Sequence, residues 1–243
     1  MDKQIRLICL PYAGGSRYSF REFQKSFPSF IELIAVEYPG RGARFSEPLL
    51  SDVNELVDDI FLQVRKVVEG GHYAVYGHSM GGLVGWLLAR KIAAAAMQAP
   101  LHLFISGTAG PASKTGHGKK RHLLPRAEFL EEIRMLAGSP DEVMKDTDLV
   151  NYYEPILRSD FKACECYRHD PSTAPLQLPF TVITGTEEEL TEDEIRLWEQ
   201  ETTGKINFIR LQGNHFFIME QCVAMTEIIK QPLLSALDRC QVF

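Results

Sequence analysis

The sequence predicts an α/β domain with a mostly parallel central sheet, helices on both faces and a helical insertion. Apolar runs of strand length alternate with helical segments along the chain. One of these units consists of a strand, a tight turn flanked by glycines and a helix. A long helical block interrupts the alternation. The 243 residues suffice for one such domain with a full core, and no linker divides them. We therefore expect a single domain spanning residues 1–243.

The expected elements follow the chain in order. Apolar runs predict strands at residues 5–10, 31–36, 73–76, 101–106, 179–184 and 206–211. Helical spacing predicts helices at residues 20–27, 52–69, 82–90, 191–202 and 221–238. The helix at 52–69 is the clearest, because its apolar residues recur on one stripe. Ser51 is expected to cap its start, and Gly70 and Gly71 are expected to end it.

The alternation stops after the fourth expected strand. Residues 113–124 are polar and basic. From there to about residue 168 the pattern is mostly helical, with breaks expected at Pro140 and Pro155. We interpret the segment at about 113–170 as a helical lid over the carboxyl edge of the sheet.

Composition excludes several classes of protein. The net charge of −6 disfavours a general nucleic-acid binder, and no apolar run reaches the roughly 18 residues of a membrane span. The N-terminus lacks the pattern of a secretory signal. Five cysteines form an odd set without metal-type spacing. These features predict a cytoplasmic protein with free thiols, which binds neither nucleic acid nor membrane. We also expect a monomer that needs no cofactor or metal.

Gly77, Ser79 and Gly81 form a G-x-S-x-G pattern between an apolar strand and a helix. This is the context of a nucleophile elbow, where a serine occupies a sharp turn and side chains two residues to either side would collide with the strand or helix. The serine then stands at a helix N-terminus, where free N–H groups favour a developing negative charge. Ser79 is therefore the candidate nucleophile.

A serine hydroxyl is a poor nucleophile at neutral pH and needs a base within hydrogen-bond reach. In hydrolases with a nucleophile elbow, the base follows the last strand, and the chain order is serine, acid, histidine. Of the seven histidines, only His215 lies there, in a glycine-marked loop. His78 is expected to help line the site. The remaining histidines fit loop or structural roles: His72, His102, His117, His122 and His169.

The acid of the triad is expected on the loop after the preceding strand, at residues 185–190. This loop offers Glu187, Glu188 and Glu189. A carboxylate here would hold the histidine tautomer and stabilise the imidazolium. The alternative is that the three glutamates form a solvated turn and that the acid lies elsewhere, for instance at Asp160.

The oxyanion of the reaction needs two backbone donors. The N–H of Met80, directly after the nucleophile, is expected to be one. The loop at residues 11–16 is expected to supply the other, because Gly14 and Gly15 let the backbone approach a substrate closely. Ala13 is the expected donor, with Tyr12 as the second choice.

Several motifs together resemble a known family. They occur in the family's order from about residue 5 to 235, at 10–16, 38–44, 76–82, 157–161, Tyr167, Trp198 and 213–217. On these motifs the chain resembles the stand-alone (type II) thioesterases of nonribosomal peptide and polyketide synthesis. It is also similar to the medium-chain acyl-carrier-protein hydrolases of fatty acid synthesis.

This resemblance implies an α/β-hydrolase fold with a mobile helical lid. It also implies hydrolysis of acyl or aminoacyl thioesters held on the phosphopantetheine arm of acyl or peptidyl carrier proteins, with clearance of misprimed or stalled carriers as the expected role. The family's acid is an aspartate three residues after the strand-end glycine; counted from Gly185, that position is Glu188, so this chain departs from the usual residue.

Other activities remain open at this stage. A medium-chain fatty acyl carrier hydrolase, a small-ester esterase, an acyltransferase and a non-catalytic binding module can all be built on the same scaffold. The basic segment at 114–121 could meet an acidic carrier surface or be a solvated loop.

Overall fold

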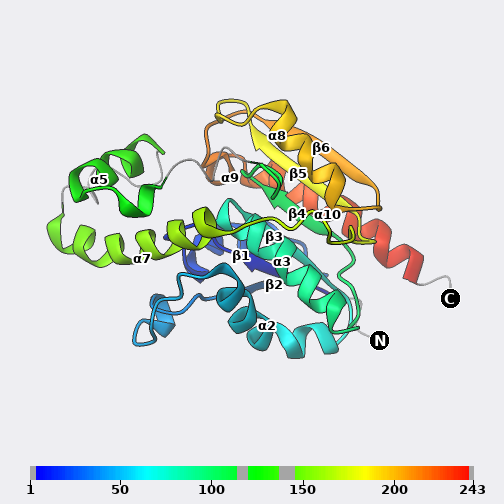
Figure 1. Ribbon diagram of the computed structural model, residues 1–243. Helices are drawn as coiled ribbons and strands as arrows, with labels where there is room; N and C mark the ends of the chain where they lie inside the picture. Colours follow the sequence, from blue (N-terminus) through cyan, green and yellow to red (C-terminus); the bar gives the residue numbers. More distant parts are fainter. Residues whose placement is uncertain (1–3, 114–119, 137–145, 241–243) are drawn as a thin grey trace.

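A parallel six-stranded sheet forms the centre of the computed structural model, which describes residues 4–113, 120–136 and 146–240 (Figure 1). The strand order is β2-β1-β3-β4-β5-β6, and every neighbouring pair is parallel. The strands are β1 (Ile5–Leu10), β2 (Ile31–Ala35), β3 (Tyr73–His78), β4 (Leu103–Ser106), β5 (Phe180–Gly185) and β6 (Ile206–Leu211). The predicted mostly parallel sheet is confirmed.

Helices cover both faces of the sheet (Figure 1). Helices α2 (Val53–Glu69) and α3 (Met80–Ala94) pack on one face, and α1 (Arg21–Ser26) and α10 (Cys222–Cys240) on the other. Successive side chains of a strand point to opposite faces, and β3 shows this: Tyr73 and Val75 belong to the core with α2 and α3. Ala74 and Tyr76 belong to the core with α1 and α10.

The remaining elements are short, apart from one long helix. They are η1 (Arg17–Phe20), η2 (Gly42–Arg44), η3 (Arg121–Leu123), α5 (Arg126–Met135), α7 (Thr147–Cys166), α8 (Glu192–Arg196), η4 (Leu197–Glu201) and α9 (Phe217–Glu220). The helix expected at 191–202 is thus divided into α8 and η4. Within the described residues, no helix is long and apolar enough to cross a bilayer.

The chain reverses its direction of strand addition at β1. It runs from β1 to β2 at one edge and then returns to place β3 on the other side of β1, with Leu10 paired to Gly77. In parallel sheets, a crevice opens at the carboxyl ends of the strands where the order reverses. The loops after β1 and β3 meet there, and both carry residues expected in the site.

Two expectations about helix boundaries were wrong. Asp52, and not Ser51, caps α2, because its carboxylate accepts hydrogen bonds from the Asn54 and Glu55 N–H groups. Pro155 lies inside α7 and does not break it. A proline removes one helical hydrogen bond. Tertiary contacts on its C-terminal side hold α7 together, such as Ser159 donating to the Leu50 carbonyl at 2.9 Å.

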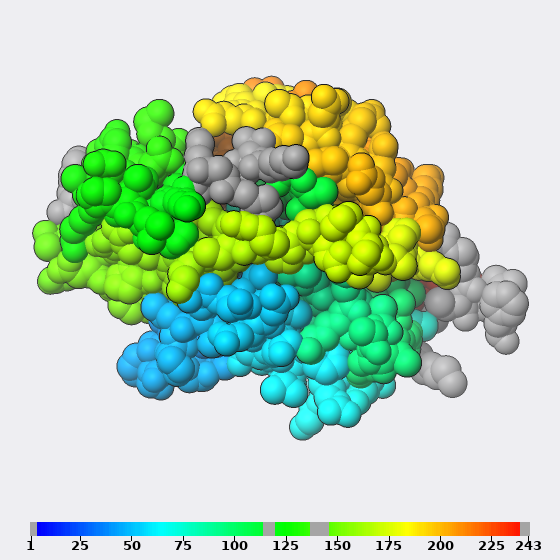
Figure 2. All heavy atoms as spheres, in the orientation of Figure 1, coloured from blue at the N-terminus to red at the C-terminus, as the bar shows by residue number. Residues whose placement is uncertain are grey.

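The expected lid segment contains η3, α5 and α7, so its described part is helical. In Figure 1, α5 and the start of α7 extend to one side of the sheet. Helix α7 also contacts α3. In Figure 2, α7 and the chain after it form a yellow-green band across the molecule, with α2 on one side. Its action as a lid stays a prediction. Residues 114–119, including His117, and Pro140 lie outside the described residues.

Candidate active site

Ser79 occupies the turn between β3 and α3. Its φ of 55° and ψ of −118° lie in a region that non-glycine residues rarely adopt, which marks a strained position held by its surroundings. A Cβ on Gly77 would overlap the Gly81 carbonyl, and one on Gly81 would overlap the Leu10 carbonyl. The two glycines therefore permit the turn, as expected of a nucleophile elbow. The Ser79 N–H donates to the Ser106 carbonyl at 2.7 Å, which fixes the turn to β4.

His215 and Glu188 are in direct contact. The Glu188 Oε1 lies 2.6 Å from His215 Nδ1, and the Gly185 N–H donates to Glu188 Oε2 at 2.7 Å. The glutamate thus folds back on the end of β5, with only 3 % of its side chain exposed, whereas 25 % of the histidine is exposed. A buried carboxylate with one oxygen on an imidazole and the other on a backbone donor is suited to hold the Nδ1–H tautomer.

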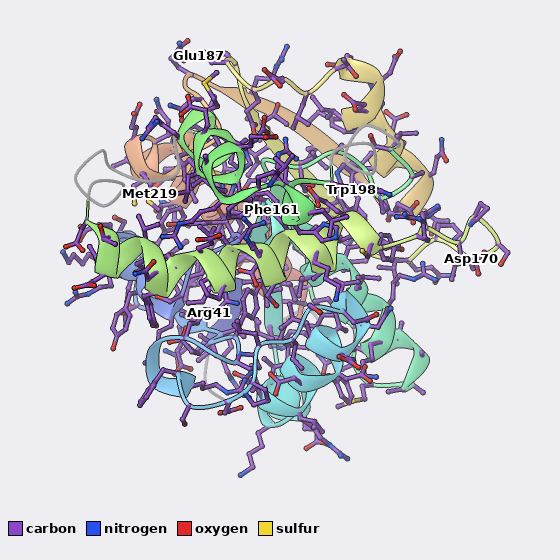
Figure 3. All side chains as sticks on the ribbon, turned by 60° about the vertical axis from the view of Figure 1, so that its left-hand side comes forward. Arg41, Phe161, Asp170, Glu187, Trp198 and Met219 are labelled. Atoms are coloured by element: carbon purple, nitrogen blue, oxygen red, sulfur yellow. The ribbon has the colours of Figure 1, made fainter. Side chains whose placement is uncertain are left out.

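The other candidate acids do not face His215. Glu187 is exposed, at the periphery in Figure 3, and accepts a hydrogen bond from Gln212, while Glu189 is exposed. Asp160 is buried in a bidentate ion pair with Arg41. Among the four alternatives, the geometry favours Glu188.

His215 is packed beside the elbow. Its ring centroid lies 5.0 Å from that of His78, the residue before the nucleophile. Gly107, at the end of β4 with φ of 64°, leaves room for both rings, because a Cβ there would overlap His78 and approach His215 Cε1 to 3.3 Å. The described residues contain no hydrogen bond between the Ser79 hydroxyl and the His215 ring, and this contact is often long before substrate binds.

His78 is fully buried beneath His215 and does not open onto the surface. Its Nδ1 lies 2.9 Å from Ser106 Oγ, which in turn lies 3.1 Å from Tyr76 Oη. Burial, reinforced by the neighbouring His215, lowers the pKa of His78 well below its usual value. His78 is therefore a neutral imidazole at physiological pH.

Three other histidines have structural partners, as expected. His122 contacts Glu165 at 2.6 Å, His169 contacts Glu201 at 2.8 Å, and His102 contacts Thr181 at 2.8 Å. None of these contacts involves the elbow. Within the described residues, no group of three or more histidine, cysteine or acidic side chains is arranged to hold a metal ion.

The expected oxyanion donors lie in two places. Met80 is the first residue of α3, so its N–H has no acceptor in the preceding turn. Residues 11–16, here named the glycine loop, contain Ala13. In the described part of the chain its N–H donates to no acceptor, whereas the Gly14 N–H donates to Asp160 Oδ2 at 2.7 Å. The assignment of Met80 and Ala13 to an oxyanion hole stays a prediction.

No role for Arg41 follows from the sequence, and Asp160 is predicted there only as an alternative triad acid. Figure 3 shows Arg41 beside α7, the helix that carries Asp160. Both residues stand inside motifs that carry the family resemblance, at 38–44 and 157–161. A charged residue inside such a motif was the available signal, but its partner could be found only in the folded chain.

Comparisons with known proteins show which sequences this chain is similar to. The thioesterase domain family model matches residues 5–233. The gramicidin S biosynthesis protein GrsT of Aneurinibacillus migulanus is 32% identical over 231 residues, which are 95% of this chain and 89% of that protein. The human medium-chain S-acyl fatty acid synthase thioesterase is 28% identical, over 98% of this chain and 89% of its own.

A solved structure is also similar over the whole chain. The crystal structure of ClbQ from the colibactin NRPS/PKS pathway superposes with a TM-score of 0.90. It is 31% identical in sequence, and the match covers 96% of this chain and 98% of that one. The fold is therefore that of the α/β-hydrolase thioesterases, as the sequence predicted.

Proposed function

Since this chain belongs to the thioesterase domain family, we propose that it hydrolyses acyl or aminoacyl thioesters on the phosphopantetheine arm of carrier proteins. Its role would be to clear misprimed or stalled carriers of a nonribosomal peptide or polyketide assembly line. The similarity to GrsT and ClbQ, which extends over nearly the whole chain, supports this substrate class. The observation that carries the proposed chemistry is the contact of His215 with buried Glu188 beside the Ser79 elbow.

The first half of the proposed reaction transfers the acyl group to Ser79. His215 Nε2 takes the hydroxyl proton as Ser79 Oγ attacks the thioester carbonyl. The Met80 and Ala13 N–H groups donate to the oxyanion that forms. The carbon–sulfur bond then breaks, and the imidazolium returns the proton to the departing pantetheine thiolate.

The second half returns the enzyme to its starting state. His215 takes a proton from water as the water oxygen attacks the acyl-serine carbonyl. The same donors stabilise the second oxyanion. When the ester bond breaks, Ser79 Oγ recovers the proton from the imidazolium, and the free acid leaves. Glu188 keeps the Nδ1–H of His215 oriented and stabilises its charge in both halves.

The proposed reaction uses side chains, backbone N–H groups and water, and it requires no cofactor. The proposed partners are acyl or peptidyl carrier proteins, and the proposed form is a monomer, which size-exclusion chromatography with light scattering would test. Cytoplasmic location is proposed as well. The free thiols Cys9, Cys164, Cys166 and Cys222 fit a reducing compartment.

A second candidate is hydrolysis of medium-chain fatty acyl carriers. The 28% identity to the human fatty acid synthase thioesterase favours it, because that match also extends over almost the whole chain. The two candidates share the chemistry of the site and differ in the acyl chain and in the carrier.

The test is a panel of purified carriers loaded with acyl, aminoacyl, peptidyl and medium-chain fatty acyl groups, scored by mass spectrometry for loss of the group. The proposal expects fastest release of acyl, aminoacyl or peptidyl groups from assembly-line carriers, with Ser79→Ala as the inactive control. Fastest release of medium-chain groups would select the second candidate. Faster cleavage of p-nitrophenyl esters than of any carrier thioester would contradict both.

A further inference from the structure

A second buried acid joins three distant parts of the chain. Asp160, in α7, lies 2.6 and 2.7 Å from the two Nη atoms of Arg41, in the loop after β2. Asp160 Oδ2 also accepts the Gly14 N–H of the glycine loop at 2.7 Å. Only 1% of the Asp160 side chain and 4% of the Arg41 side chain are exposed. Both carboxylate oxygens therefore have charged or backbone donors, as a buried carboxylate requires.

The glycine loop is fixed at several points around Ala13. Before it, the Pro11 carbonyl accepts the Tyr38 hydroxyl at 3.0 Å. After it, the Gly14 N–H is bound to Asp160, and the Gly15 carbonyl accepts Arg41 Nη1 at 3.3 Å. The Ala13 N–H, which has no acceptor among the described residues, thus lies between fixed neighbours, two of which are fixed by the Arg41–Asp160 pair.

Helix α7 also limits the shape of the loop at Gly14. This residue has φ of 76°, and a Cβ there would lie 2.6 Å from Leu157 Cδ2. Leu157 and Asp160 are one helical turn apart, so they face the loop together. A small shift of α7 would therefore move the loop or break its hydrogen bond to Asp160.

From these contacts we propose that Arg41 and Asp160 are positioning residues, which hold the glycine loop so that the Ala13 N–H meets the oxyanion. The inference rests on the proposed function, since it names how one of its donors is placed. Asp160 engages the Gly14 N–H and leaves that of Ala13 free, and Arg41 neutralises the buried carboxylate and binds the next carbonyl. The pair acts on the reaction through the loop and does not touch the substrate.

The test compares Asp160→Asn with wild type in two measurements. The first is kcat and KM for a soluble acyl thioester. The second is the affinity for an alkyl boronic acid, which bonds to Ser79 Oγ and places a boronate oxygen where the oxyanion forms. We expect kcat to fall about 10- to 100-fold with KM within about threefold, and boronate affinity to fall by a similar factor.

Asp59→Asn is the matched control. Asp59 makes a bidentate pair with Arg44, at 2.7 and 2.8 Å, that is more exposed than the Arg41–Asp160 pair. Among the described residues, neither side chain is hydrogen-bonded to the glycine loop. The kcat of Asp59→Asn should therefore stay within about threefold of wild type. A folded Asp160→Asn protein with wild-type kcat, or one with reduced kcat and unchanged boronate affinity, would overturn the proposal. Equal losses in both variants would also overturn it.

If Asp160→Asn does not fold, the double variant Arg41→Met with Asp160→Leu replaces the test. It leaves no unpaired charge and keeps the interior filled. The same losses are expected from it, and wild-type kcat would reject the proposal. If wild type cleaves no acyl thioester, the proposed function fails. Boronate binding then still tests the pair, because the adduct needs only Ser79 and the oxyanion donors.

Discussion

Two buried acids near the carboxyl edge of the sheet have similar surroundings and different partners. Glu188 accepts the Gly185 N–H and contacts His215, while Asp160 accepts the Gly14 N–H and contacts Arg41. Each thus links a glycine at or after a strand end to a basic side chain. The two basic groups differ in one property: an imidazole can lose and regain a proton, whereas a guanidinium stays charged.

This difference separates two uses of a carboxylate. Beside His215, whose side chain is one quarter exposed, the acid can stabilise a charge that appears and disappears during turnover. Beside Arg41, which is almost fully buried, it can only hold a permanent charge and the backbone around it. The first arrangement suits proton transfer, and the second suits a fixed loop.

The largest expected effect comes from removing the nucleophile, because the proposed roles of both acids concern the reaction at Ser79. Ser79→Ala should lower kcat for carrier thioesters by about 10⁴-fold or more, because the covalent route is lost. Circular dichroism should show an unchanged fold. Turnover near the wild-type rate would place the reaction at another group and remove the basis of the comparison.

The next effect distinguishes Glu188 from its neighbours in sequence. Glu188→Gln should lower kcat by about 10³-fold, since a neutral amide no longer stabilises the imidazolium and favours the wrong tautomer. Glu187→Gln and Glu189→Gln serve as controls and should stay within about threefold, because both side chains are exposed. Similar losses in all three variants would mean that this turn acts only through its net charge.

Substitution of Asp160 should destabilise the protein more than substitution of Glu188, although it should lower kcat less. Asp160→Asn should lower the free energy of unfolding by about 3 kcal/mol, because it leaves the buried Arg41 charge unpaired. Glu188→Gln should change it by less than about 1 kcal/mol, since its partner can be neutral. Urea unfolding of both variants gives the two values. A larger loss of unfolding free energy in Glu188→Gln than in Asp160→Asn would contradict the assignment of different roles to the two acids.

The smallest expected effect concerns His78, which packs beside His215, the partner of Glu188. Because the pKa of His78 is lowered in the folded protein, acidification protonates this histidine in the unfolded chain before it does so in the folded one. Stability should therefore be complete above the unfolded pKa of about 6.5 and fall below it, by at most about 1.4 kcal/mol per pH unit. His78→Gln should flatten this dependence in urea unfolding between pH 5 and 7.5, and an unchanged slope would contradict it.

Local signals in the sequence predicted much of the fold. The alternation of apolar runs and helical stripes predicted the parallel sheet, and the pattern at Gly77, Ser79 and Gly81 predicted the turn at Ser79. Such features depend on residues within a few positions of one another, so a single sequence contains them. Two local predictions were wrong: α2 is capped by Asp52 and not by the adjacent Ser51, and Pro155 lies inside α7, where contacts outside the helix outweigh one lost hydrogen bond.

By itself, the sequence determined a strand–turn–helix unit with a candidate nucleophile, one suitably placed histidine and a turn with three glutamates. The family resemblance pointed to Glu188 by its position after Gly185, but only the tertiary structure showed that this glutamate contacts His215. The tertiary structure alone also brought together Gly14, Arg41 and Asp160, since Asp160 is separated from the other two by 146 and 119 positions. Contacts over such distances are fixed when the sheet and its helices pack, and no local pattern encodes them.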